Sequence, residues 1–415
     1  MFKIISVWLG QAPYPLAATV LFSQIALGIV LFSIFQEFVP FKLEARDAWT
    51  GYLLAIYGGS RFIFEPFAGA ISDRVERKLG MILGLILMLT GLALMGLFWN
   101  AYAYLAFSGV LGLATAFLWP AIYAISADFY SSSERGKAVG FLNSAQLIGF
   151  GFGALLGAFL VNQLPTLLFI CAVIAILFAL FTAIIWIPSY RGGGIIPKIE
   201  REQRPPLKSV LSKKLVFWST LVLLTMMGVS IMIPAIRAYG THQLGVSFTT
   251  LSLLLFPSIA IGAALYIPSG HFADSAGRII PLLVGQLCVI TGGLVVAATR
   301  DPIVASAFTA LIFCGYVFSI PALSAGMMDL APPSHRGTLI GLMVGLTGLG
   351  FAIGPAISGA IVDAFDAPRA FQAGSIAATV SAVAVLIYGI IYGRERPSSQ
   401  PPEAEDVINI KKLKT

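Results

Sequence analysis

Four charged residues lie inside long apolar stretches of this 415-residue chain. Arg61 and Glu65 are four positions apart, so on a helix they share a face and can neutralise each other. Glu37 and Arg237 lie in two other apolar stretches. A charge at the centre of a membrane-spanning helix costs about 2.5–3.5 kcal/mol on insertion scales. Side chains kept at that cost are candidates for ion coupling or for gating.

The sequence leaves the roles of these charges open. Glu37 is either a carboxylate that binds and releases a proton or one partner of an ion pair that locks an outer gate. Arg61 and Glu65 form either a structural pair or part of the coupling machinery, and Arg237 contacts an anion or a gate residue.

Polar, aromatic and Met side chains within the apolar stretches are the candidates for a substrate cavity. Met and aromatic side chains adapt to varied shapes, which suits lipophilic or aromatic substrates. Each such residue can equally be an ordinary packing residue or an interhelical hydrogen bond. The candidates are Gln24, Trp119, Tyr123, Met232 and Tyr316.

The composition excludes a soluble protein. The chain is 58% hydrophobic and 11% charged, whereas soluble domains carry about 25% charged residues. Apolar runs recur that are long enough to cross the hydrocarbon core as helices. We therefore expect an all-α integral membrane protein. Its expected spans are about 15–40, 48–71, 79–99, 102–128, 136–162, 166–188, 215–240, 248–271, 279–299, 302–329, 337–362 and 369–392.

Polar segments divide the chain and set its expected orientation. Residues 1–188 and 215–393 form two six-helix halves, 189–214 a cytoplasmic linker, and 394–415 a disordered cytoplasmic tail. With the N-terminus in the cytoplasm, Lys and Arg number 20 in cytoplasmic segments and 4 in outside loops. This asymmetry predicts that both termini are cytoplasmic. The net charge of +7 thus sets topology and gives no support for nucleic-acid binding.

An internal repeat runs through both halves. One fixed offset of 201 positions relates residues in several spans, which predicts two halves of parallel topology. The related pairs include Asp73 and Asp274, Pro120 and Pro321, Gly149 and Gly350, and Gly153 and Gly354.

A charged stretch after the second span repeats after the eighth. GAISDRVERK occupies 69–78, and GHFADSAGR occupies 270–278. The first resembles the signature of the major facilitator superfamily, Gly-x-x-x-Asp-Arg-x-Gly-Arg-Arg/Lys, with Glu76 where the second Gly is usual. The matching positions are Gly69, Asp73, Arg74, Arg77 and Lys78, with Gly270, Asp274, Gly277 and Arg278 in the repeat.

The resemblance implies twelve transmembrane helices in two pseudo-symmetric six-helix bundles, and transport by alternating access. In that family the signature acts as a latch that holds the outward-open state; the simpler alternative is that its charges only enforce topology. The chain looks most like the drug:proton antiporter branch, on its long first span, RFIFEPFAGAISDR at 61–74 and ERG at 134–136. This favours proton-coupled efflux of lipophilic, drug-like molecules.

Other readings remain open. Ala154 stands where drug exporters of this family often have Pro, so the direction of transport is open. A carrier of a polar metabolite or organic anion is the first alternative, and a non-transporting receptor or enzyme a distant one.

We expect no enzyme activity, metal or cofactor, with a proton or other ion gradient as energy source. The expected partners are a small-molecule substrate and the lipid bilayer, and no nucleic acid. We expect the protein to be a monomer. We expect a multi-pass protein of a prokaryotic inner (plasma) membrane.

Overall fold

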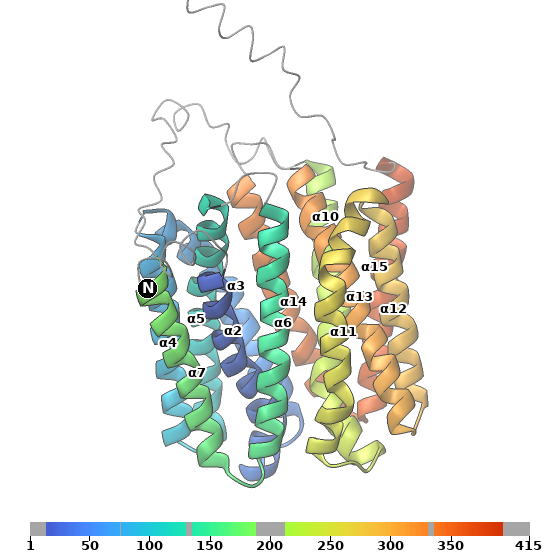
Figure 1. The fold of residues 1–415 in the computed structure, drawn as a ribbon. Coiled ribbons are helices and arrows are strands. Elements are labelled where there is room, and N and C mark those ends of the chain that lie inside the picture. The colour runs from blue at the N-terminus through green and yellow to red at the C-terminus, as the bar shows by residue number, and fades with distance from the viewer. Residues whose placement is uncertain (1–13, 75, 130–134, 188–211, 331–335, 393–415) are drawn as a thin grey trace, which may run out of the picture.

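The computed structural model is a bundle of long helices that run side by side (Figure 1). It describes residues 14–74, 76–129, 135–187, 212–330 and 336–392, and these ranges contain no strand. The predicted all-helical class is therefore confirmed. The predicted linker lies almost wholly outside the described residues, as does the predicted tail.

The helices follow the predicted spans closely. The first span is α2 (Tyr14–Gly28) continued by η1 (Ile29–Lys42), and the seventh is α10 (Lys213–Ala238) continued by η2 (Tyr239–Gln243). The other helices are α3 (Ala48–Arg74), α4 (Arg77–Leu97), α5 (Ala101–Phe129), α6 (Arg135–Leu160), α7 (Pro165–Trp186), α11 (Phe248–Ser275), α12 (Ile279–Ala298), α13 (Pro302–Asp329), α14 (Arg336–Ala364) and α15 (Ala367–Tyr392).

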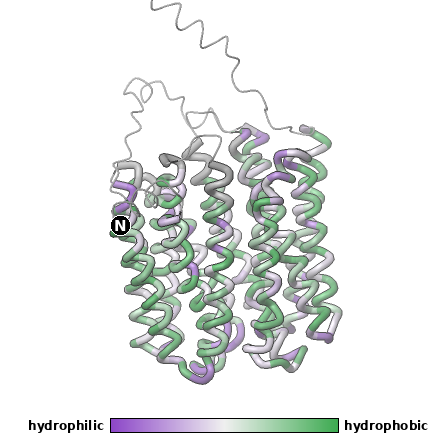
Figure 2. The backbone as a smooth tube through the Cα atoms, in the orientation of Figure 1, coloured by the Kyte–Doolittle hydropathy of each residue, from purple (hydrophilic) through white to green (hydrophobic). Residues whose placement is uncertain are grey.

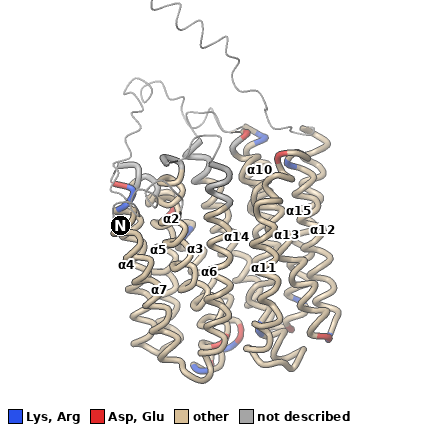
Figure 3. Tube along the Cα trace, viewed as in Figure 1, with Lys and Arg blue, Asp and Glu red and all other residues tan. Residues whose placement is uncertain are grey.

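Most of these helices suit a bilayer. Within the described ranges, 11 helical spans are long and apolar enough to cross a membrane. The twelfth is α3, whose 27 residues are long enough but include Arg61 and Glu65, which lower its hydropathy. Apolar residues predominate along the helices in Figure 2, and charged residues gather toward the two ends of the bundle in Figure 3. The protein is thus an integral, multi-pass membrane protein, and the residues that the structure describes contain twelve membrane-length helices.

The repeat in the sequence reappears as a repeat in packing. In the first half, Gly149 and Gly153 of α6 face the backbone of α2, where an added Cβ would collide with the carbonyl oxygens of Leu21 and Ile25. In the second half, Gly350 and Gly354 of α14 face α10 in the same way, against Met226 and Ser230. Glycines at equivalent positions therefore let equivalent helices approach closely.

Two helix pairs make the most extensive contacts between the halves: α3 packs against α14, and α6 packs against α11. The α3–α14 contact is close because glycines lie on both sides of it. A Cβ at Gly51 or Gly58 would collide with the α14 backbone, and one at Gly359 would press on the carbonyl oxygen of Ala48. The backbones of α3 and α14 therefore lie almost in contact where the halves meet.

The first helix of each half ends in wider, π-helical turns. The segments η1 and η2 both lie toward the end of the bundle that carries the loop 43–47, called here the 43–47 end. Turns of this kind are uncommon and often occur at functional sites. Here η1 carries Glu37, and η2 follows directly after the turn that carries Arg237.

Gly153→Ala should destabilise the protein, because the new methyl group would overlap the Ile25 carbonyl. Overpacking of this kind costs about 1–3 kcal/mol. The matched control is Gly270→Ala, since a Cβ at Gly270 meets no atom within 4 Å. Thermal unfolding in detergent should show a lower Tm for Gly153→Ala and no loss for Gly270→Ala. Equal Tm values would contradict the close α2–α6 contact.

Candidate functional site

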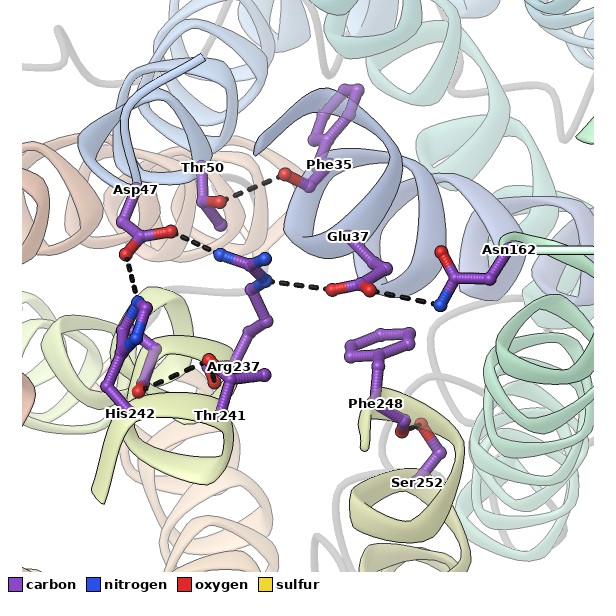
Figure 4. A network of polar contacts seen from close by, with 11 residues as sticks. Phe35, Glu37, Asp47, Thr50, Asn162, Arg237, Thr241, His242, Phe248 and Ser252 are labelled. Atoms are coloured by element: carbon purple, nitrogen blue, oxygen red, sulfur yellow. Dashed lines mark hydrogen bonds and ion pairs between the residues drawn. The ribbon is translucent and has the colours of Figure 1, made fainter. Parts of the chain in front are cut away.

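A buried ion-pair network joins the two halves at the 43–47 end (Figure 4). Glu37 is 5% exposed and Arg237 is 8% exposed. Arg237 Nε donates a hydrogen bond to Glu37 Oε2 at 2.8 Å, and its Nη1 donates to Asp47 Oδ1. One guanidinium from the second half thus holds two carboxylates from the first. We call Glu37, Asp47, Asn162, Arg237 and His242 the cross-half network.

The outer partners complete this network. Asn162 Nδ2 donates to the second oxygen of Glu37 at 3.1 Å. His242 Nε2 lies 2.9 Å from Asp47 Oδ2, and its side chain is 61% exposed. The network thus places two carboxylates around one guanidinium, with an imidazole at its exposed edge.

Local backbone contacts position the network. Thr50 Oγ1 donates to the Phe35 carbonyl at 2.9 Å and so fixes the start of α3 against η1. Thr241 Oγ1 donates to the Arg237 carbonyl at 3.0 Å and ties η2 to the end of α10. A further bond between the halves lies nearby, where Thr249 Oγ1 of α11 donates to the Ala158 carbonyl of α6 at 2.9 Å.

A second group of polar side chains lies at mid-depth. Arg61 is the central residue of α3, and Glu65 follows one turn later with 2% exposure. Their contacts are long: Arg61 Nε lies 3.4 Å from Glu65 Oε2, and Arg61 Nη2 donates to Glu65 Oε1 at 3.5 Å. The predicted pair therefore exists, but it is loose for a buried ion pair.

Tyrosines from both halves lie within electrostatic range of this pair. The Arg61 guanidinium interacts electrostatically with the phenol groups of Tyr123 on α5 and Tyr316 on α13. Tyr266 on α11 in turn interacts with both of these phenols. We call Arg61, Glu65, Tyr123, Tyr266 and Tyr316 the central cluster.

Two more side chains support the central cluster. The Tyr123 hydroxyl donates to Asn143 Oδ1 of α6 at 3.3 Å. Trp119 is 3% exposed and stacks on Tyr123, with ring centroids 5.4 Å apart. Helices of both halves therefore converge on one polar and aromatic site.

The charged signature of the first half makes contacts within that half. Arg77 Nη1 donates to the Ala124 carbonyl of α5, and Lys78 Nζ donates to the Ile184 carbonyl of α7, both at 2.8 Å. Both carbonyls lie near helix C-termini, where cations are favoured. Gly69, Asp73 and Arg74 belong to α3, but their side-chain surroundings lie outside the described residues. The latch role therefore stays a prediction.

The repeat of the signature is an ion-pair cluster. Arg278 is 5% exposed, and it donates from Nε to Asp329 Oδ2 and from Nη1 to Asp274 Oδ1, both at 2.8 Å. Burial opposes the Arg278 charge, but the hydrogen bonds to Asp329 and Asp274 outweigh it and raise the pKa of the guanidinium. Gly277 has a φ of 81°, which favours glycine, whereas Glu76 in the first copy has a φ of −60°. The change from Gly to Glu thus accompanies a different turn.

The structure places the four charges predicted inside the spans in two separate groups. Glu37 meets Arg237, and Arg61 and Glu65 meet Tyr123 and Tyr316. Two cavity candidates lie elsewhere. Met232 packs against Gly293 and Gly374 within the second half, and the Cβ of Gln24 faces Gly149 on α6. Both positions favour helix packing.

Sequence reasoning missed Asp47, His242, Asn162 and Tyr266. The first two are in the short stretches that follow the spans of Glu37 and Arg237. The sequence offered one indication of Asp47 and His242, which is that they lie within ten residues of Glu37 and Arg237.

Comparison with known proteins agrees with this architecture. The family model described as Major Facilitator Superfamily matches residues 16–346 and 315–414. The chain belongs to this superfamily.

The names of similar proteins refer to different classes of transported molecule. Multidrug resistance protein 2 of Bacillus subtilis is 27% identical over 337 residues, covering 75% of this chain and 80% of that protein. The human chromaffin granule amine transporter is 27% identical over 343 residues, covering 79% of this chain and 62% of that protein. The crystal structure of the human organic anion transporter MFSD10 shares the fold, with a TM-score of 0.70 at 16% identity, covering 91% of this chain and 99% of that one.

Glu37→Gln and Arg237→Gln should each lower Tm, because each breaks the buried Glu37–Arg237 pair from one side, and Arg237→Gln also removes the partner of Asp47. Breaking a buried pair from one side costs about 3–5 kcal/mol. The double variant should lower Tm by less than the sum of the single variants, since it leaves neither charge behind. Arg46→Gln is the control, because the Arg46–Asp363 contact is long, at 3.9 Å, and Arg46 is 84% exposed. Additive losses would show that the pair contributes no coupling.

Proposed function

We propose that this chain is a secondary active transporter that exports lipophilic, drug-like small molecules in exchange for protons. One arrangement carries the proposal: buried ion pairs close the 43–47 end between the halves, while both halves supply the central cluster. A carrier needs these two parts, a site at mid-depth and a gate that closes one side of it. The similarity to multidrug resistance protein 2 of Bacillus subtilis supports a drug-like substrate.

The cross-half network acts as the gate. Its contacts between the halves, from Arg237 to Glu37 and Asp47 and from His242 to Asp47, exist only while the halves lie together at the 43–47 end, so they stabilise one conformation over the other. Opening this end would expose Glu37, Asp47 and Arg237 to water, which solvates the separated charges and limits the cost of breaking the pairs. The gate can therefore open and close without leaving a charge in the hydrocarbon core.

Glu65 carries the proton in this proposal. The second candidate, Glu37, is already held by Arg237 and Asn162 in the closed gate. Glu65 instead lies at mid-depth, is 2% exposed, and makes only long contacts with Arg61. A carboxylate at this position can exchange its proton with whichever side the halves open to.

The excess of Lys and Arg at the opposite end supports an orientation with the 43–47 end outside and both termini in the cytoplasm. The signature residues then lie on the cytoplasmic side, where the family resemblance assigns them the latch. The bacterial relative supports a plasma-membrane location.

A carrier of organic anions is the second candidate, and Arg61 favours it. Its guanidinium is at the centre of α3 and presents donors that Glu65 satisfies only loosely. An anionic substrate would find its partner there.

Glu65→Gln should abolish the response of transport to a pH gradient, because glutamine cannot carry the proton. The measurement is uptake of tetraphenylphosphonium or ethidium into proteoliposomes of the purified protein, with and without an imposed gradient. We expect gradient-driven accumulation by the wild-type protein and only equilibration by the variant.

Glu44→Gln is the matched control, because Glu44 is exposed in the 43–47 loop. It should accumulate substrate as the wild type does. Gradient-driven accumulation by Glu65→Gln would remove Glu65 as the proton carrier. Absence of accumulation of any probe by the wild type would contradict proton-coupled export of lipophilic compounds.

A further inference from the structure

The Arg61–Glu65 pair has unused hydrogen-bonding capacity on both partners. Among the described residues, Arg61 Nε and Glu65 Oε2 make no hydrogen bond, although they lie 3.4 Å apart. Glu65 is 2% exposed, so water does not readily compensate it. A buried polar atom without a partner costs about 1–3 kcal/mol, and more when it is charged. A ligand that supplied both missing partners would recover this free energy.

The charge balance of the site restricts what that ligand can be. Arg61 and Glu65 cancel each other, and the three other members of the central cluster are tyrosines. A singly charged cation that drew Glu65 away from Arg61 would leave the guanidinium uncompensated. A singly charged anion that drew Arg61 away from Glu65 would leave the carboxylate uncompensated. Either ligand adds an unbalanced charge to a poorly solvated site.

A ligand with both charges avoids this cost. Its carboxylate can accept hydrogen bonds from Arg61 while its ammonium donates to Glu65, so that four charges alternate in sign around one small ring. Neither protein charge loses its partner, and the net charge of the site stays zero. The close spacing of Arg61 and Glu65 matches an ammonium and a carboxylate that are near neighbours in the ligand.

The aromatic side chains near the Arg61–Glu65 pair indicate the rest of the ligand. Tyr123 stacks on Trp119 on the side of the first half, and Tyr266 and Tyr316 come from the second half. Aromatic faces favour an aromatic group and also attract a nearby cation. A ligand held between them would contact both halves.

We propose that the central cluster binds zwitterionic aromatic molecules, with the ligand carboxylate on Arg61 and the ligand ammonium on Glu65. This inference rests on the proposed function and specifies the substrate class for that same site. A zwitterionic ligand accounts for the presence of both Arg61 and Glu65, since a carrier of cations alone would need only the carboxylate and a carrier of anions alone only the guanidinium. It also gives a reason for exchange, since a proton and an ammonium group at Glu65 exclude each other.

Three indole compounds with the same ring test the proposal: tryptophan, which is zwitterionic, tryptamine, which is a cation, and indole-3-propionate, which is an anion. Their affinities for the purified full-length protein are measured by calorimetry and by ligand-induced shifts in Tm. The wild type should bind tryptophan about tenfold or more tightly than either of the others, which is about 1.4 kcal/mol or more.

Two variants assign the contacts, and Glu44→Gln is the control. Arg61→Gln should bind tryptamine in preference to tryptophan, because the ligand carboxylate has lost its partner. Glu65→Gln should bind indole-3-propionate in preference to tryptophan, because the ligand ammonium has lost its partner. Glu44→Gln should keep the wild-type order.

The proposal is overturned if the wild type binds none of the three compounds, or does not prefer tryptophan, or if both variants keep the wild-type order. Transport of tetraphenylphosphonium, a cation without a carboxylate, separates this outcome from failure of the proposed function. Gradient-driven transport of that cation without a preference for tryptophan would leave the exporter standing and remove the zwitterion site. A preference for tryptophan without transport of any probe would leave the zwitterion site standing and remove the exporter.

Discussion

The cost of placing charge inside an apolar bundle governs this structure. Each buried charge described here has a partner of opposite sign, and the partners differ in how tightly they hold it. Arg237 binds Glu37 at 2.8 Å and also holds Asp47, and Arg278 binds Asp274 and Asp329 at 2.8 Å. The Arg61–Glu65 contacts are 3.4 and 3.5 Å. The tight pairs hold helices together, and the loose pair lies where we propose that the substrate binds.

Close helix packing is the second constraint, because it fixes where these charges can meet. Glycines on α6 and α14 bring α2 and α10 close within the halves, and glycines along α3 and α14 bring the halves themselves together. Arg61 and Glu65 belong to the same helix that forms this close contact. Movement of α3 against α14 would therefore change the surroundings of the central cluster directly.

The sequence was sufficient to predict the elements and the fold class, because hydropathy and the 201-residue repeat act over whole helices. It also indicated that Glu37 and Arg237 are charges kept inside apolar stretches, and the structure shows them as a buried pair. It did not indicate Asp47, in a loop, or His242, in η2 at the end of the seventh span, because these residues meet only through the way in which the two halves pack. Met232 shows a related limit: an apolar helix offers no periodicity that says which face meets the cavity, and this side chain packs within its own half.

The most direct test of alternating access through this gate is a reversible cross-link between Asp47 and His242, whose side chains lie 2.9 Å apart across the halves. Asp47→Cys and His242→Cys are introduced together into a protein whose three native cysteines, Cys171, Cys288 and Cys314, are replaced. A short bifunctional thiol reagent that forms reducible disulfides is then applied. The account predicts that the reagent stops transport by the double variant, leaves the transport rate of each single variant as it was before the reagent, and that reduction restores transport. Full transport by the cross-linked protein would contradict it, because the 43–47 end would then have no need to open.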